Sequence, residues 1–142
     1  MAKLTDKDFL RNPDLGLLLV RITVGGLLLF HGIAKLNGGL AGVEGMLTAL
    51  GLPTFLAYGA LLCEVVAAAM VLLGVCTRAA SAAIVANMIV AILMAHAGDI
   101  FSINPATGGW AIELPMLYLL PALALCFTGG GKYALTRKTV LD

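Results

Sequence analysis

The chain has 142 residues, of which 61% are hydrophobic and 12% charged, and its mean hydropathy is +1.01. Soluble globular proteins carry about 25% charged residues, so this chain has too few to cover a surface that faces water. The formal net charge is only +1, and no basic patch interleaved with aromatic residues is present, which excludes a typical nucleic-acid-binding surface. The composition predicts a protein that lies in a lipid bilayer.

Four apolar segments are close to the length of a membrane-spanning helix, which is about 20 residues at 1.5 Å rise each. They are residues 15–36, 54–76, 79–97 and 111–128. The first contains Arg21 and no small-x-small cleavage site follows it, so it is predicted to be a helix rather than a signal peptide. We therefore expect a single domain, residues 1–142, that is an all-α polytopic membrane protein with a four-transmembrane-helix bundle.

Two connections on one side of the predicted bundle differ in character. Residues 37–53 are too apolar for a free loop, and Val43–Leu50 is expected to form a short helix that lies at the interface or dips inward. Residues 98–110 are rich in turn residues, with Phe101 and Trp110 placed to anchor at the lipid boundary.

The basic residues are distributed unequally between the two sides of the predicted bundle. One side holds Lys3, Lys7, Arg11, Arg78, Lys132, Arg137 and Lys138. The loops of the other side hold only Lys35. Because Lys and Arg are enriched in cytoplasmic loops, both termini are predicted to be cytoplasmic.

Three polar residues are predicted near the middle of the membrane. Arg21 shares a helix side with Gly25 and Gly32, where another helix can approach closely. Glu64 and Asn87 each lie among alanines on their own helices. Counting the rise per residue places all three at similar depth, which predicts an intramembrane ion pair between Arg21 and Glu64, with Asn87 as a supporting polar group. Whether this pair has a function or only sets the helix register is left open.

Four further polar residues, His31, Lys35, His96 and Glu113, are predicted in the outer third of the membrane. His31 and Lys35 lie one turn apart on one helix face, and Glu113 begins the last helix at the same depth. We expect them to line a polar pocket that opens toward the outer leaflet, with Glu113 as the partner of Lys35. In the alternative, Lys35 reaches the lipid headgroups, His31 bonds to a backbone carbonyl, and His96 is an interfacial histidine.

Several short motifs resemble one known family in their order and spacing. They are Arg21, then His31-Gly32-x-x-Lys35-Leu36, Gly51-Leu52-Pro53, Glu64, the turn from Leu73 to Ala80, His96, and Gly108-Gly109 before Glu113. In these features the chain resembles the DoxX family of small bacterial membrane proteins, named for the small subunit of a thiosulfate:quinone oxidoreductase. The resemblance implies a four-helix fold in the bacterial inner (plasma) membrane and involvement in quinone-linked redox metabolism of sulfur or oxidative stress.

The chemistry of the polar residues allows more than one function. A quinone needs hydrogen-bond donors and proton-exchanging groups, which the predicted pocket supplies. The chain has no flavin or nucleotide fingerprint and no C-x-x-C pair, so it is predicted to be a subunit or accessory of a quinone-dependent oxidoreductase rather than a complete enzyme. The alternatives are a non-enzymatic scaffold or anchor for a partner protein, and a haem or metal held by His31, His96 and Glu113, although no tight ligand spacing favours a metal. A homo-oligomer is also compatible with the small-residue faces.

Overall fold

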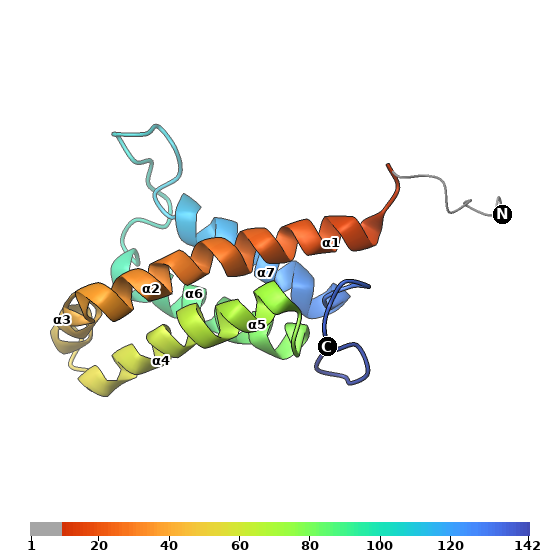
Figure 1. Ribbon diagram of the computed structural model, residues 1–142. Coiled ribbons are helices and arrows are strands. Elements are labelled where there is room, and N and C mark those ends of the chain that lie inside the picture. The colour runs from red at the N-terminus through yellow and green to blue at the C-terminus, as the bar shows by residue number, and fades with distance from the viewer. Residues whose placement is uncertain (1–9) are drawn as a thin grey trace.

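The computed structural model describes residues 10–142 and consists of antiparallel helices that run along one long axis (Figure 1). Lys3 and Lys7, which contribute to the predicted topology, lie outside the described residues. The first helix contains α1 (Pro13–Arg21), the wide π-turn η1 (Ile22–Gly26) and α2 (Leu27–Gly38). After α3 (Ala41–Ala49), the second contains η2 (Thr54–Leu56), α4 (Ala57–Leu62), the π-turn η3 (Cys63–Ala67) and α5 (Ala68–Leu73). The third is α6 (Thr77–Ala95) and the fourth is α7 (Glu113–Thr128).

Three of these helices are long and apolar enough to cross a membrane, and the fourth is shorter. The three run over Pro13–Gly38, Thr54–Leu73 and Thr77–Ala95, whereas α7 is apolar but has 16 residues. The chain is therefore all-helical over residues 10–142, apart from one isolated bridge between Ile103 and Trp110. The sequence predicts four membrane spans, and three helices of the described residues are long enough for one.

Local signals explain where the first helix begins and where the second ends. The Asn12 side chain accepts a hydrogen bond from the backbone N–H of Leu15 at 3.0 Å, and Pro13 occupies the first turn, where a missing N–H costs nothing. At the other site, Gly74 follows α5 with a φ of +76°, which only glycine adopts readily. These residues define the positions of two helix ends, which hydrophobicity alone predicts only to within several residues.

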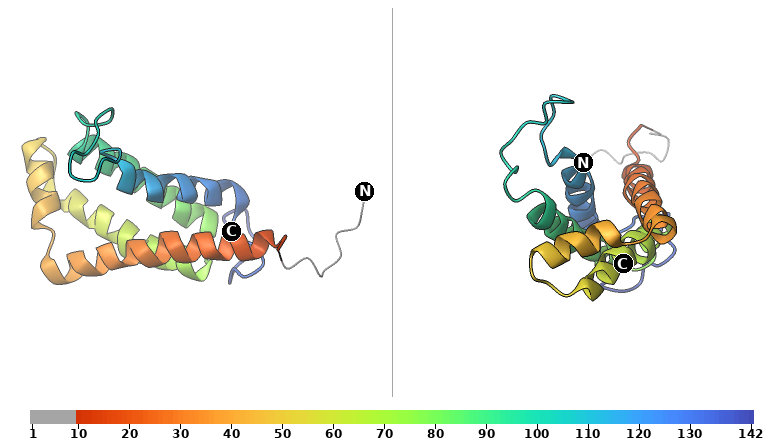
Figure 2. Two further views of the ribbon diagram at one scale, coloured as in Figure 1. Left: turned by 90° about the horizontal axis from the view of Figure 1, so that it is seen from above. Right: turned by 90° about the vertical axis from the view of Figure 1, so that its left-hand side faces the viewer.

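The connection between the first two long helices forms a short helix across one end of the bundle (Figure 2). This helix, α3, covers Ala41–Ala49, close to the predicted Val43–Leu50. Leu47 is its buried residue, with 3% exposure, so α3 packs onto the bundle through this side chain. The connection therefore turns inward at this point.

The segment after α7 covers the opposite end of the bundle. Residues 129–142 fold back along the turn between α5 and α6, where the N–H groups of Leu135 and Thr136 bond to the carbonyls of Leu73 and Gly74. The Leu141 carbonyl accepts hydrogen bonds from the first N–H groups of α6, those of Arg78 and Ala79. This segment thereby satisfies backbone groups that a helix end leaves without partners.

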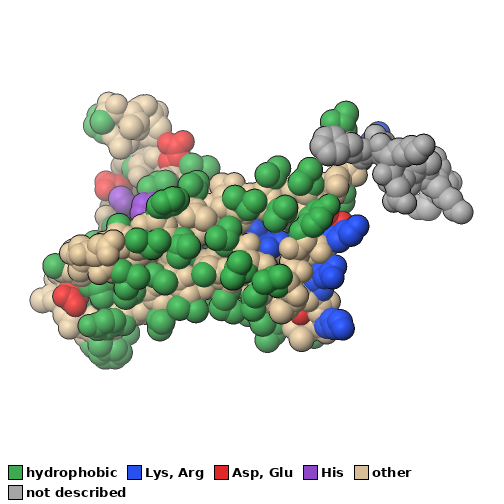
Figure 3. Space-filling model, viewed as in Figure 1, with side chains coloured by type: hydrophobic (Ala, Val, Ile, Leu, Met, Phe, Trp, Pro, Cys, Tyr) green, Lys and Arg blue, Asp and Glu red, His purple; other side chains and the backbone are tan. Residues whose placement is uncertain are grey.

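The interior of the bundle is small, and most large apolar side chains point outward. The core contains Val24, Leu28, Ala68, Val71, Ile84, Ala122 and Leu125. Outward-facing residues include Leu19, Phe30, Leu62, Leu93 and Phe127. In Figure 3, hydrophobic side chains cover the helices along their length on the face shown. Such a surface is stable in lipid and would aggregate in water.

The first and second helices touch through glycines. A Cβ added to Gly25 would lie 2.6 Å from the Ala68 carbonyl oxygen, and one added to Gly32 would lie 2.5 Å from the Glu64 carbonyl oxygen. Both distances are shorter than any real contact of this kind, so the two backbones meet at these positions. The predicted close approach of another helix at Gly25 and Gly32 is confirmed.

Candidate functional site

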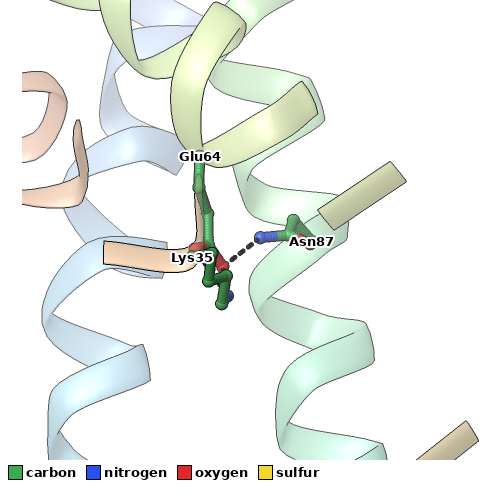
Figure 4. Close-up of polar contacts among 3 residues, drawn as sticks. All are labelled: Lys35, Glu64 and Asn87. Carbon is green, nitrogen blue, oxygen red and sulfur yellow. Dashed lines mark hydrogen bonds and ion pairs between the residues drawn. The ribbon is translucent and has the colours of Figure 1, made fainter. Parts of the chain in front are cut away.

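The charged contact in the middle of the bundle joins Lys35 to Glu64 (Figure 4). Lys35 is in the last turn of α2, and its Nζ lies 2.5 Å from each carboxylate oxygen of Glu64, which belongs to the π-turn η3. From α6, Asn87 Nδ2 reaches Glu64 Oε1 at 3.5 Å. Glu64 is thus held from two directions, and its side chain is only 8% exposed.

The sequence motif around His31 accounts for this arrangement. Gly32 has no side chain, so α2 contacts the backbone of η3 directly at Glu64. Lys35 follows Gly32 by one helical turn on the same side, which brings its ammonium group to the Glu64 carboxylate. The π-turn carries Glu64 itself, and such wide turns are frequent at functional sites.

A cavity of about 180 Å³ lies beside this ion pair, between α2, η3, α6 and α7. Its polar lining consists of His31, Glu64, His96 and Tyr118, and the other lining residues are apolar. The structure therefore brings His31 and His96 together, as predicted for the polar pocket. Lys35 does not line this cavity and meets it only through Glu64.

Three polar side chains of the cavity have no hydrogen-bond partner among the described residues. Within residues 10–142, neither imidazole of His31 and His96 nor the hydroxyl of Tyr118 makes a hydrogen bond. The Tyr118 ring contacts the His31 ring edge-on, with centroids 5.8 Å apart and planes at 87°. Tyr118 is only 8% exposed, and a buried tyrosine hydroxyl usually has a partner.

Tyr118 is the residue of the site that the sequence interpretation missed. It lies one turn and a half beyond Glu113 in an apolar helix, where it reads as an ordinary core aromatic. The available signal was its polar hydroxyl at a position surrounded by leucine, alanine and methionine.

The predicted ion pair between Arg21 and Glu64 is wrong. The Arg21 guanidinium is buried, with 1% exposure, and donates to three backbone carbonyls instead. They are those of Val71 at 3.0 Å, Leu72 at 3.0 Å and Gly130 at 3.1 Å. Arg21 therefore holds the end of the second helix and the segment after α7, and Glu64 pairs with Lys35.

The physical reason is the register of the first two helices. The predicted first helix ends at residue 36 and the predicted second helix begins at residue 54. If these two residues lay at the same height, Glu64 would lie opposite residue 26, about 7 Å along the axis from Arg21. In the structure Gly32 meets Glu64, so that the axial separation from Arg21 is about 16 Å. The pairing is thus shifted by six residues, about 1.7 turns, and the extension of the first helix to Gly38 accounts for two of them.

Glu113 is not part of the cavity. It is exposed at the start of α7, and its carboxylate lies next to Gly109 in the preceding loop. The predicted pairing of Glu113 with Lys35 is therefore also corrected, because Lys35 bonds to Glu64. The set His31, His96 and Glu113, considered for haem or metal, is not assembled, and no group of three His, Cys, Asp or Glu among residues 10–142 is arranged to hold a metal ion.

A second, larger cavity of about 700 Å³ lies on another face of α6. It is bounded by α3, α4 and α6, and aliphatic side chains make up most of its lining. Asn87 and Cys63 are its polar or polarizable members. The partition between the two cavities thus contains the Asn87–Glu64 contact.

Two comparisons with known proteins find relatives of this chain. The chain is 29% identical to a Bacillus subtilis (strain 168) protein named "Putative oxidoreductase CatD", over 86% of this chain and 85% of that protein. No solved structure matches. The sequence pattern of the DoxX family matches residues 16–97, which include Arg21, the His31–Leu36 motif, Glu64 and His96. Because this match covers the first three long helices and the polar residues between them, the chain belongs to the DoxX family of membrane proteins.

Proposed function

We propose that this protein is a bacterial inner-membrane subunit or accessory in quinone-linked redox metabolism, and that the cavity beside Glu64 binds the quinone headgroup. The observation that carries the proposal is that three hydrogen-bonding side chains around one cavity, those of His31, His96 and Tyr118, have no partner within residues 10–142. Tyr118 is buried, His96 is half-buried and His31 is exposed. An unpaired polar group within the hydrocarbon is costly unless a ligand or water satisfies it. A quinone offers two ring oxygens that suit such groups.

The roles of the side chains follow from their chemistry. The Tyr118 hydroxyl donates to a quinone carbonyl, and a neutral histidine presents one donor and one acceptor nitrogen. The apolar part of the lining, from α2, α6 and α7, contacts the faces of the ring. The electrons are exchanged with a redox group on a partner subunit, because quinone chemistry requires a second redox centre. The name of the Bacillus subtilis relative, an oxidoreductase, is consistent with this role.

The proposed topology has four spans with both termini in the cytoplasm. Lys and Arg side chains gather at the end of the molecule where the C-terminal segment lies (Figure 3), and they include Arg78, Lys132, Arg137 and Lys138. The 16 residues of α7 extend about 24 Å, which together with flanking residues approaches the hydrocarbon thickness of about 30 Å. The basic end is assigned to the cytoplasm by the usual excess of Lys and Arg there.

A photoreactive azidoquinone tests the proposed function on the purified protein in lipid nanodiscs. Labelling is expected on peptides that contain His31, His96 or Tyr118, and His31→Ala is expected to reduce it about tenfold, equivalent to roughly 1.4 kcal/mol of binding free energy. Phe30→Ala is the matched control, because Phe30 is adjacent in sequence but does not line the cavity. Equal labelling of the two variants, or labelling confined to outward-facing residues, would contradict the proposal. A partner protein that co-purifies without any quinone would favour the scaffold function.

A further inference from the structure

The cavity contains a carboxylate whose charge is already compensated. Glu64 is the charged side chain of the lining, and Lys35 Nζ contacts both of its oxygens at 2.5 Å. Lys35 approaches from α2 outside the lining, with a side chain that is 28% exposed. A ligand in the cavity therefore meets a carboxylate paired with an ammonium group that lies behind it.

The remaining polar groups facing the cavity add no fixed opposite charge. They are the Tyr118 hydroxyl and the imidazoles of His31 and His96, none of which carries a permanent charge. Asn87, which reaches Glu64 Oε1 from α6 outside this lining, is a neutral amide. Around such a pair the interior has a low effective dielectric, so an uncompensated charge would act strongly on any ligand. The compensation depends on Lys35 alone among the residues that contact the Glu64 carboxylate within the described chain.

We propose that Lys35 is a positioning residue that determines which ligand charge the cavity accepts. By neutralising Glu64, it makes the cavity select uncharged rings and reject cations. This inference rests on the proposed function only in taking the cavity as a ligand site. A cation that entered would have to share the carboxylate with the ammonium group, which repels it. Without Lys35 the same cavity would present a stranded carboxylate beside the aromatic ring of Tyr118, and both features attract cations. The residue excludes the wrong ligand by repulsion at a distance.

Two single-ring probes of opposite type test this inference: methylhydroquinone, which is neutral, and N-methylpyridinium, which is a permanent cation. Binding is measured by calorimetry on protein in uncharged nanodiscs at mildly alkaline pH, where protons compete least for a free carboxylate. Wild-type protein is expected to bind the cation at least about tenfold more weakly than Lys35→Gln does. Lys35→Arg should behave as wild type, because it restores the positive charge. The double variant Lys35→Gln/Glu64→Gln should lose the cation binding again, because no carboxylate is left.

A relocated charge separates this role from a merely structural one. In Lys35→Gln/Asn87→Lys the ammonium group reaches Glu64 from α6 instead of α2, and rejection of N-methylpyridinium is expected to return. If Lys35→Gln folds poorly, the readout is the yield of folded protein after extraction, which millimolar N-methylpyridinium should raise for this variant and not for wild type. Unchanged cation binding or yield in Lys35→Gln would overturn the inference. Cation binding in Lys35→Gln with no binding of methylhydroquinone to wild type would support the inference and count against the quinone function.

Discussion

Arg21 is a buried cation whose contacts are all with main-chain oxygens. Its three hydrogen bonds go to Val71, Leu72 and Gly130, and no carboxylate among the described residues neutralises it. The carbonyls of Val71 and Leu72 lie at the end of α5, where backbone oxygens lack intrahelical partners and carry partial negative charge. The planar guanidinium reaches them from three different nitrogen atoms, Nε, Nη1 and Nη2, whereas the donors of a lysine ammonium all lie on one nitrogen and cannot span acceptors on separate segments in the same way.

Arg21→Lys is therefore expected to destabilise the protein by about 2–4 kcal/mol, because at least one buried carbonyl loses its donor. The measurement is unfolding in mixed micelles by increasing amounts of denaturing detergent. Lys138→Gln serves as the control, since Lys138 is exposed and should change stability by less than about 0.5 kcal/mol. A loss in Arg21→Lys no larger than in the control would show that these hydrogen bonds do not stabilise the fold.

Asp142 makes the stability of the segment after α7 depend on pH. Its carboxylate accepts hydrogen bonds from the Thr136 hydroxyl and from the Lys138 and Thr139 backbone, and these lower its pKa from 3.8 to about 2, with the Thr136 bond as the largest cause. Because the pKa of Asp142 is lower in the folded than in the unfolded chain, its carboxylate stabilises the fold at every pH above the unfolded-state pKa. This stabilisation is lost as the pH falls through the folded-state pKa. Asp142→Asn should thus have a lower unfolding temperature than wild type at neutral pH, and the difference should disappear between pH 3.8 and about 2. A difference that stays constant down to the lowest pH would contradict this assignment.

At the scale of the helices, the contact of Gly32 with the second helix sets the geometry of the ion pair. The carbonyl of Glu64 lies where a Gly32 side chain would be, so the position of the carboxylate relative to Lys35 depends on this contact. A small residue at this position is thus as important to the ion pair as the two charged residues themselves.

Gly32→Ala is expected to destabilise the protein by about 1–3 kcal/mol, because the added methyl group would force α2 and η3 apart. Separation should also expose the Lys35 amine, so its reaction rate with a membrane-permeant acylating reagent should rise. Gly26→Ala is the matched control, since its Cβ would meet only Leu72 Cδ1 at an ordinary 3.9 Å. Equal stability and equal Lys35 reactivity in the two variants would refute the role of the glycine contact.

Sequence periodicity predicted which sides of the helices face inward, but it did not predict their relative heights. Gly25 and Gly32 share a side with Arg21, and this side packs on the second helix. The relative height depends on how residues 39–53 pack against the end of the bundle. The sequence predicts the short helix in this connection, but not the packing that sets the height of the two long helices. His31 and His96 line one cavity, whereas the predicted partners of Arg21 and Lys35 differ from those in the structure. Tyr118 was missed because its depth on α7 has meaning only when that register is known.

For the whole molecule, the two ends of the bundle carry different chemistry. One end has α3 and the loop after α6, and the other has the basic C-terminal segment (Figures 1 and 3). This asymmetry is the basis of the proposed orientation in the membrane.

Single cysteines placed at the two ends test the orientation in intact cells. The native Cys63, Cys76 and Cys126 are first replaced by alanine. Ser102→Cys, in the exposed loop before α7, is expected to react with an impermeant maleimide from outside, and Lys138→Cys only after the membrane is permeabilised. The reverse pattern of labelling would place both termini outside and contradict the proposed orientation.

The contact between Arg21 and Gly130 spans 109 residues of sequence, and this has a consequence for biosynthesis. At a translation rate of about 5–20 residues per second, the third acceptor of Arg21 is made roughly 5–20 s after Arg21 itself. During this interval the first helix holds an incompletely bonded guanidinium, a group that is costly in hydrocarbon. We therefore expect the first helix to stay beside the protein-conducting channel, or near the headgroups, until the final segment is synthesised. Gly130 then completes the hydrogen bonding of Arg21.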